Sequence, residues 1–420
     1  RIPVVIPPPA ELQQAADLLA GCRRVVILAG SGARGGRHDL EAAAEVLGAP
    51  IIKPLLGKDV VPDDSPYTTG GIGLLGTRPS AEALEECDGL LIVGSSFPYI
   101  EYLPPPGQAV AVQIDADPAR IGLRYPVAVG LAGDGPATVR ELLPLLRRNE
   151  DRAFLARAQH GYRDWINLME QRGTDDVVPM RPQRVAWELG RLLDDDAIIV
   201  SDTGTVTTFA ARQVMVRAQQ RFSVSGNLAS MANGLPYAIA AQVAYPGRQV
   251  VAIVGDGSLS MLMAELATAV MHSLPIKVVV FKNNSLAMIK WEQMVFLGNP
   301  EFGCELQPID FAMVAEACGA TGVRIEDPTQ CSRQLAAALA LEGPVLIEAV
   351  VDQFEAPMPP KVTPGQAKNM ALSLAKGEPN RQRIGLTLFR NTIKETAFPA
   401  SPAGVPARVA AKVADVFDLE

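Results

Sequence analysis

The sequence has few of the residues that build disulfide frameworks or histidine-rich metal centres. Its 420 residues include only three histidines and five scattered cysteines with no CxxC pair: Cys22, Cys87, Cys304, Cys318 and Cys331. This pattern argues against a thiolate zinc site and against a disulfide-stapled fold. The reducing cytoplasm is therefore the expected location, and peripheral attachment to the inner membrane stays an open alternative.

Long apolar runs and an excess of positive charge are lacking as well. No apolar stretch approaches the roughly 18–20 residues of a membrane span, and no secretory leader pattern follows Arg1. Lys and Arg number 38 against 46 Asp and Glu, a net charge of −8, so the chain as a whole is not expected to bind nucleic acid electrostatically. With 48% hydrophobic residues the chain can fill real cores, and its length predicts two or three domains.

Short β-rich runs alternate with helical patterns over the first third of the chain. Strands are expected at 24–30, 50–54, 89–94, 109–115 and 127–134, and helices at 38–48, 79–87 and 135–148. Such alternation is typical of an α/β fold with a parallel sheet covered by helices. We assign residues 1–150 to a first doubly wound domain and the polar, helical stretch 151–180 to a connecting arm.

A second alternation follows the arm. Strands are expected at 197–204, 248–256, 276–284 and 343–351, and helices at 184–193, 205–214, 236–244 and 259–273. Residues 181–355 therefore form a second doubly wound, parallel-sheet domain in this prediction. The composition shifts toward Pro, Lys and Gln after Phe354, and we assign residues 356–420 to a C-terminal helical tail.

Two polar clusters follow neighbouring strands of the second domain. Gly255, Asp256 and Gly257 end one strand, and Asn283 with Ser285 ends the next. In a right-handed βαβ unit these strand ends lie on one edge of the sheet, so Asp256 and Asn283 can converge. Their carboxylate and amide oxygens suit Mg²⁺, and the glycines and the helix after Ser258 suit a diphosphate. For either cluster alone, a strand–turn–helix with a capping Asp is the alternative.

This spacing resembles the thiamine diphosphate enzymes, whose signature is GDG followed some two dozen residues later by an asparagine pair. The resemblance implies that Asp256, Asn283 and the carbonyl of Ser285 hold Mg²⁺. Lys282 stands where most relatives have the first Asn of the pair, so the usual hydrogen-bond partner of this loop is not carried over. The resemblance also implies a diphosphate loop at SDTGTVT (201–207), and in GNLASMANGLP (226–236) a large apolar residue, Met231, that bends the cofactor. The implied cofactor residues are Gly204, Thr205, Ala229, Ser230, Met231, Gly255, Asp256, Gly257, Ser258, Asn283, Ser285, Leu286, Ala287 and Met288.

The first domain carries GSGARG at 30–35, a GxGxxG after a strand. No acidic residue ends the second strand, as a nicotinamide site would require. Together with GIGLLG (71–76), GSSFPY (94–99), QIDADPARIG (113–122) and a second GDG (133–135), it resembles the central FAD domain of the pyruvate oxidase and acetolactate synthase group. The FAD-binding residues so implied are Gly30, Gly32, Gly73, Leu74, Leu75, Gly94, Ser95, Ser96, Phe97, Pro98, Tyr99, Asp115 and Asp134. An α/β domain with an emptied flavin site stays the alternative.

Within this group, FKNNSLAMI and PPKVTPGQAK look most like the pyruvate oxidases and quinone-linked pyruvate dehydrogenases. The resemblance implies oxidative decarboxylation of pyruvate or a similar 2-oxo acid with thiamine diphosphate, Mg²⁺ and FAD, the electrons passing to a quinone or oxygen. Two alternatives stay open: a carboligase like acetolactate synthase, with structural FAD, and a cofactor-binding subunit without turnover of its own.

The glutamate that activates the cofactor in these enzymes lies on an N-terminal pyrimidine-binding domain. The sequence starts where that domain is expected to end, and no residue present can be nominated for the glutamate, so the catalytic residue is unknown. We expect a fragment, or a chain that works with a separate pyrimidine-domain polypeptide, and the resemblance implies a homodimer or homotetramer. The segment 376–398 does not resemble the family's membrane-docking helix, so membrane contact is not supported.

Overall fold

The computed structural model describes residues 4–357, 359–385 and 387–388. They form two compact units. Unit 1 holds the residues up to Trp165 together with Met215–Phe222, and unit 2 holds Ile166–Val214 and the described residues from Ser223 onward. Helix α5 (Ala153–Gly173), in the predicted arm, contributes residues to both units. The domain boundaries proposed from the sequence stay predictions.

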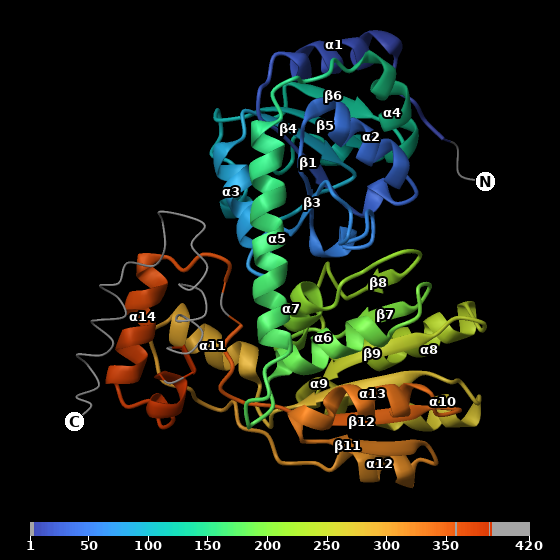
Figure 1. Cartoon of the computed structure of the whole chain (residues 1–420), viewed down its shortest axis with the longest axis vertical. Coiled ribbons are helices and arrows are strands. Elements are labelled where there is room, and N and C mark those ends of the chain that lie inside the picture. The colour runs from blue at the N-terminus through green and yellow to red at the C-terminus, as the bar shows by residue number, and fades with distance from the viewer. Residues whose placement is uncertain (1–3, 358, 386, 389–420) are drawn as a thin grey trace. The chain divides into compact units, whose positions relative to one another are not determined.

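Unit 1 is built on a six-stranded parallel sheet in the order β3-β2-β1-β4-β5-β6 (Figure 1). The order reverses between β1 and β4, and ligands of open α/β sheets bind at the carboxyl ends of strands at such a switch point. The predicted doubly wound α/β fold is confirmed. The elements are α1 (Pro9–Ala20), β1 (Val25–Ala29), α2 (Arg37–Leu47), β2 (Ile51–Lys53), β3 (Thr68–Gly71), α3 (Arg78–Glu86), β4 (Gly89–Val93), β5 (Val110–Asp115), β6 (Val129–Ala132) and α4 (Gly135–Leu142).

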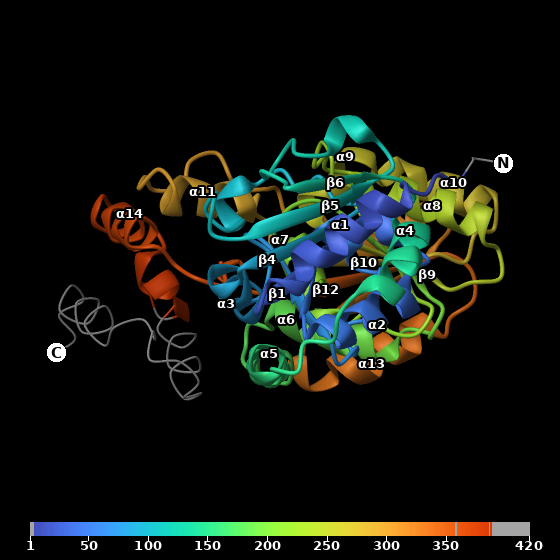
Figure 2. The same cartoon turned by 90° about the horizontal axis from the view of Figure 1, so that it is seen from above.

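Helices cover both faces of this sheet. Successive side chains of a strand point to opposite faces, so Val25 and Ile27 of β1 join a core cluster with α1, α2 and α4, whereas Val26 and Leu28 join one with α3. Helices α1 and α4 lie side by side (Figure 2). Because both faces are covered, every residue of β1 is buried, which explains its unbroken apolar run.

Unit 2 is built on a second parallel sheet of six strands, in the order β11-β12-β10-β9-β7-β8. Here the order reverses between β7 and β9, and the second predicted doubly wound sheet is confirmed. The elements are α6 (Pro182–Leu192), β7 (Ile198–Ser201), α7 (Thr205–Gln213), β8 (Arg221–Ser223), α8 (Gly234–Ala244), β9 (Val250–Gly255), α9 (Asp256–Leu262), α10 (Leu266–Met271), β10 (Lys277–Lys282), α11 (Ala287–Val295), α12 (Phe311–Ala317), β11 (Thr321–Ile325), α13 (Cys331–Leu339), β12 (Val345–Val350) and α14 (Pro364–Ala375).

The second sheet is also covered on both faces. One face buries Val254, Val278 and Leu346 against α8, α9, α10 and α12, and α6, α7 and α13 lie on the other (Figure 1). A smaller cluster around Trp291 and Phe354 joins α11 to α14. Both strands that precede the predicted metal turns, β9 and β10, are therefore rigidly held.

Two predicted helices differ from the structure. The single helix predicted over 259–273 is wrong: α9 already begins at Asp256, because extended Gly255 forms its N-cap, and it ends at Leu262, whose φ of −136° is not helical. A 3-10 turn then precedes α10. The helix predicted over 135–148 ends at Leu142 and continues as a 3-10 turn, because Pro144 has no N–H to donate.

Three strands, β3, β8 and β11, lie outside the predicted elements. All three are edge strands of their sheets, and none of them is a continuous apolar run. In β11 only Ile325 is buried, and β3 contains two glycines, which are poor strand formers.

Of the predicted tail, the described part contains α14, which begins with a capping box of Thr363 and Gln366. The remainder of the C-terminal helical tail predicted over 356–420, from position 389 onward, lies outside the described residues. No helix in the described ranges is both long and apolar enough to cross a membrane.

Candidate functional site

The carboxyl ends of β7, β9 and β10 meet at the switch point of the second sheet. Asp202 follows β7, Asp256 follows β9, and Asn283 follows β10. Parallel strands bring these three residues to one edge because their carboxyl ends all point the same way.

Asp256 joins the two predicted metal turns directly. Its Oδ2 accepts hydrogen bonds from the main-chain N–H groups of Asn283, at 3.0 Å, and Asn284, and its Oδ1 accepts from Gly257 at 2.8 Å. Burial raises the pKa of this carboxyl, although the N–H donors and the Lys282 ammonium oppose the shift. Asp256 and Asn283, 27 residues apart, are thus brought together as their strand positions predict.

The turn after β10 has a defined conformation. The Asn283 Oδ1 accepts from the Ser285 N–H at 3.0 Å, and Asn284 has a left-handed φ of 54°. Leu286 and Leu306 hydrogen-bond to the backbone of the facing segment, at 2.8 and 2.9 Å, and pin the turn. The Asp256 carboxylate and the Asn283 side-chain oxygen therefore belong to two adjoining turns, and they are hard oxygen donors of the kind that Mg²⁺ prefers.

Sequence reasoning missed Asp202, which organises the other side of the site. Its carboxylate accepts from the main-chain N–H groups of Thr203 (2.7 Å), Ala232 (3.0 Å) and Gly234 (2.9 Å). Burial raises its pKa. Asp202 therefore ties the predicted diphosphate loop at 201–207 to the predicted Met231 loop. An acidic residue at a strand end was the available signal.

Met231 lies beside the GDG turn. A Cβ on Gly257 would lie 2.8 Å from Leu286 Cδ2 and 3.9 Å from Met231 Cε, so these apolar side chains enclose the turn. Ala229 and Ser230, just before Met231, are exposed. Ala229 and Ala232 adopt left-handed φ values of 49° and 68°, strain of a kind that clusters at binding sites.

The remaining predicted cofactor residues lie in the same turns. Gly204 forms the N-cap of α7 and Thr205 is its first residue. Ser258 donates from Oγ to the Thr203 carbonyl at 3.3 Å. Buried Ala287 and half-buried Met288 open α11, directly after Leu286.

These residues fit a metal-bound diphosphate. The Thr203 Oγ1 and Ser285 Oγ atoms are buried and have no hydrogen-bond partner among the described residues, and a Cβ at Gly204 or Gly255 would meet no atom within 4 Å. Hydroxyl donors and room for a ligand thus coincide. Among the described residues, no group of three or more His, Cys, Asp or Glu side chains is placed so that it could hold a metal ion, so a metal here would depend on amide and carbonyl oxygens beside one carboxylate.

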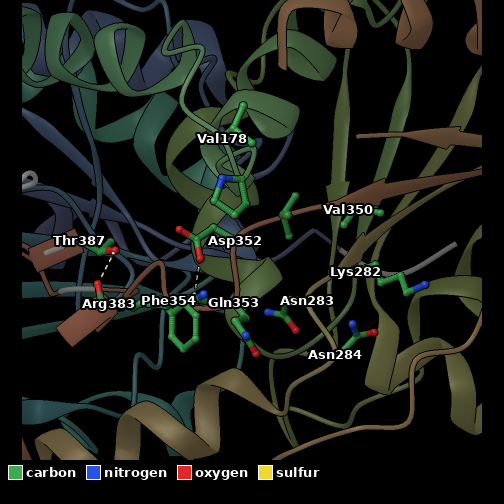
Figure 3. Close-up of a pocket in the computed structure, with 12 residues that line it drawn as sticks. Val178, Lys282, Asn283, Asn284, Val350, Asp352, Gln353, Phe354, Arg383 and Thr387 are labelled. Atoms are coloured by element: carbon green, nitrogen blue, oxygen red, sulfur yellow. Dashed lines mark hydrogen bonds between the residues drawn. The ribbon is translucent and has the colours of Figure 1, made fainter. Parts of the chain in front are cut away.

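A cavity of about 460 Å³ lies beside the turn that follows β10 (Figure 3). Asn283 and Asn284 line one part of it, and Asp352, Gln353 and Phe354, which follow β12, line another. The contribution of the segment after β12 could not be predicted from the sequence, because no motif marks it.

In unit 1, the predicted flavin turns meet at the switch point between β1 and β4. A Cβ on Gly30 would lie 2.4 Å from the Gly94 carbonyl oxygen, and a Cβ on Gly32 would lie 2.8 Å from the Gly94 Cα. A Cβ on Gly135 would lie 2.5 Å from the Gly32 carbonyl oxygen. The glycines let three turns pack backbone to backbone. Close packing of the backbone therefore explains why glycine stands at these positions, without a bound ligand.

The other predicted flavin residues surround these turns. A Cβ on Gly73 would touch the Phe97 ring at 3.0 Å, which brings the 71–76 loop, with half-buried Leu74 and Leu75, to the loop at 94–99. In the 94–99 loop, the Phe97 ring contacts the Tyr99 ring edge-on, and the Ser95 Oγ accepts a hydrogen bond from the Phe97 N–H. The Ser96 hydroxyl accepts a hydrogen bond from Arg120, and Pro98 is exposed. Asp115, buried at the end of β5, accepts from the Asp117 N–H, and Asp134 caps α4 by accepting from the Ala137 N–H. A helix-capping role accounts for Asp134 without a ligand.

Known protein families match both units. Residues 202–349 match the model of the thiamine pyrophosphate enzyme C-terminal TPP binding domain, and residues 12–142 that of the central domain of the same enzymes. The chain is 39% identical over 388 residues to the "Putative thiamine pyrophosphate-containing protein YdaP" of Bacillus subtilis, an alignment covering 92% of this chain and 67% of that protein. This chain belongs to the thiamine pyrophosphate enzyme family.

Other relatives within the thiamine pyrophosphate enzymes divide between two named activities. A "Probable acetolactate synthase large subunit" of Methanocaldococcus jannaschii is 31% identical, over 86% of this chain and 63% of that protein. The pyruvate oxidase of Lactiplantibacillus plantarum is 30% identical, over 79% of this chain and 56% of that enzyme. The chain thus spans between about half and two thirds of the length of these relatives. The C-terminal domain match includes Asp202, Asp256 and Asn283.

Proposed function

We propose that unit 2 of this thiamine pyrophosphate enzyme binds Mg²⁺ and thiamine diphosphate through Asp256, Asn283 and the Ser285 carbonyl. We further propose that the protein decarboxylates pyruvate or a similar 2-oxo acid oxidatively, with FAD bound in unit 1 and a quinone or oxygen as final acceptor. The observation that carries the first proposal is the Asp256 carboxylate, held by the main-chain N–H groups of Asn283 and Asn284.

Each group of the site has a distinct task in this proposal. Asp256 and Asn283 supply oxygen ligands to the metal, which neutralises the diphosphate charge. Thr203 Oγ1 and Ser285 Oγ, both without a partner among the described residues, donate to phosphate oxygens. Met231 and Leu286 form an apolar wall beside Gly257. Thiamine diphosphate, when bound, supplies the electron sink for the carbanion left by loss of CO₂.

Binding of the cofactor tests the assignment of the metal ligands. Asp256→Ala removes the only carboxylate of the proposed ligand set, so we expect it to abolish Mg²⁺-dependent binding of thiamine diphosphate in calorimetry. Asp327→Ala serves as a control because Asp327 caps an exposed 3-10 turn elsewhere in unit 2, and it should bind normally. Near-normal affinity of the Asp256→Ala variant would disprove the proposed site.

The acetolactate synthase relatives support a second candidate, a carboligase in which FAD is structural. Stoichiometric bleaching of the bound flavin by pyruvate without oxygen supports oxidative decarboxylation, whereas formation of acetolactate with the flavin unchanged supports the carboligase. If a protein that binds both cofactors shows neither flavin bleaching nor acetolactate, the result supports a cofactor-binding subunit.

A dimer or tetramer and a cytoplasmic location are parts of the same proposal.

A further inference from the structure

The last residue of β10, Lys282, carries a buried ammonium group next to the proposed metal turn. Its Nζ donates to Glu348 Oε1 at 3.0 Å, and the two residues are 5% and 0% exposed. In the sheet, Glu348 lies opposite Val280, two residues before Lys282 and therefore on the same face. The pair thus connects the end of β10 to the neighbouring strand β12.

Glu348 is itself held by several elements. Its Oε2 accepts from the N–H groups of Phe311 (2.6 Å) and Ala312 (3.2 Å), at the start of α12. Arg324 of β11 places a guanidinium nitrogen 3.1 Å from Oε1. A carboxylate bonded to two strands and a helix start cannot move without breaking several charge-assisted bonds, so it is a rigid anchor for Lys282.

We propose that Lys282 is a positioning residue: its ion pair with Glu348 holds the end of β10 so that the Asn283–Ser285 turn meets Asp256 and presents its oxygens to Mg²⁺. This inference rests on the proposed function. The pairing also explains how the site accommodates lysine before Asn283. An unpaired ammonium beside a divalent cation would repel it, and Glu348 supplies the compensating charge.

Lys277 provides a matched control at the other end of the same strand. It is also buried, at 4% exposure, but its Nζ donates to the Leu341 and Gly343 carbonyls, the latter at 2.8 Å. Lys277→Met therefore removes a buried ammonium from β10 without touching the metal turn.

The positioning role is tested first without metal, by amide hydrogen exchange. In Lys282→Met, the Asn283 and Asn284 amides, which donate to Asp256, should exchange about tenfold faster, because opening their hydrogen bonds becomes easier. Lys282→Arg should restore slow exchange, and Lys277→Met should leave these two amides unchanged. Equal exchange in Lys282→Met and the unaltered chain would overturn the inference, as would an equal increase in Lys277→Met.

Metal affinity gives the second readout. Glu348→Gln removes the charge that compensates the Lys282 ammonium next to the metal turn. Changes just outside the ligands of a metal alter its affinity by about 10–100-fold, so in a Mg²⁺ titration by calorimetry with saturating thiamine diphosphate, Glu348→Gln should weaken binding by about tenfold. The double variant Lys282→Met/Glu348→Gln should bind Mg²⁺ more tightly than Glu348→Gln, because it carries no uncompensated ammonium. A double variant no better than Glu348→Gln would overturn the charge argument.

The two proposals fail in different ways. Normal binding by Asp256→Ala contradicts the proposed function. Loss of binding in Asp256→Ala, together with unaltered exchange and affinity in the Lys282 and Glu348 variants, supports the function and disproves the positioning role.

Discussion

Buried carboxylates with backbone partners are the main chemical feature at the scale of single residues. Asp202 and Asp256 each accept three main-chain N–H groups, and burial raises the pKa of both. Such groups order the loops around them, yet they keep an ionised oxygen at a cost in desolvation. A bound cation would offset that cost.

The pKa direction predicts how stabilisation by the cofactor depends on pH. Because the folded-state pKa of Asp256 lies above its ordinary value of 3.8, this carboxyl stabilises the metal-free fold below that value and loses this contribution as pH rises through the raised pKa. Binding of Mg²⁺ with thiamine diphosphate should restore this contribution to stability. The increase in melting temperature on adding both should therefore be larger near neutral pH than in the acid range. An equal increase at both pH values would contradict this assignment.

At the scale of elements, both candidate sites are made of turns that follow parallel strands at a switch point. The fold of unit 1 shows how tightly such turns can pack. Gly94 has a left-handed φ of 57°, and a Cβ there would lie 2.5 Å from the Gly32 backbone. The turn after β4 therefore depends on glycine for two separate reasons.

Substitution of two glycines separates these reasons. Gly94→Ala should cost about 1–2 kcal/mol for the left-handed backbone and about 1–3 kcal/mol more for overpacking, and it should prevent flavin binding. Gly35 also has a positive φ, 87°, but a Cβ there would meet no atom within 4 Å. Gly35→Ala should therefore carry only the backbone cost. Denaturant unfolding and flavin absorbance measure both effects, and equal losses in the two variants would contradict the packing argument.

At the scale of the whole molecule, unit 1 includes a segment distant in sequence, Met215–Phe222. Asp63 attaches it: the Asp63 N–H donates to the Val216 carbonyl at 2.7 Å, and the Val216 N–H donates to Asp63 Oδ2 at 2.8 Å. The same carboxylate pairs with buried Lys53 and Lys58 at 2.7 and 2.8 Å. Burial favours the neutral acid, but the two ammonium groups together hold the pKa of Asp63 below its ordinary value.

Removal of this charge should destabilise unit 1 strongly. Asp63→Asn removes the carboxylate that pairs with both buried ammonium groups, and breaking a buried ion pair typically costs about 3–5 kcal/mol. Exposed Asp64, the next residue, is the control, and Asp64→Asn should stay within about 0.5 kcal/mol. Since the pKa of Asp63 is lowered, its contribution should be present above pH 3.8 and disappear as pH falls through the lowered pKa. Urea unfolding at several pH values measures this, and similar stabilities of the two variants would contradict it.

The sequence alone was enough to place Asp256 and Asn283 at neighbouring strand ends and to predict two doubly wound sheets. This prediction succeeded because β1, β9 and β10 are buried on both faces, so their sequences are nearly continuous apolar runs. The right-handed crossover between β9 and β10 then brings the carboxyl ends of these two strands to one edge of the sheet. Those signals are local or topological, so no long-range contact needs to be known.

Only the tertiary structure revealed the partners of those residues. The contacts of Asp202 with Ala232 and Gly234, of Lys282 with Glu348, and of Met231 with the GDG turn join positions about 26 to 66 residues apart. The edge strands β3, β8 and β11 were missed for a related reason, since their pairing to a neighbour defines them more than their own apolar pattern. A side chain's hydrogen-bond partner depends on how separate elements pack, and neither periodicity nor motif spacing encodes that packing.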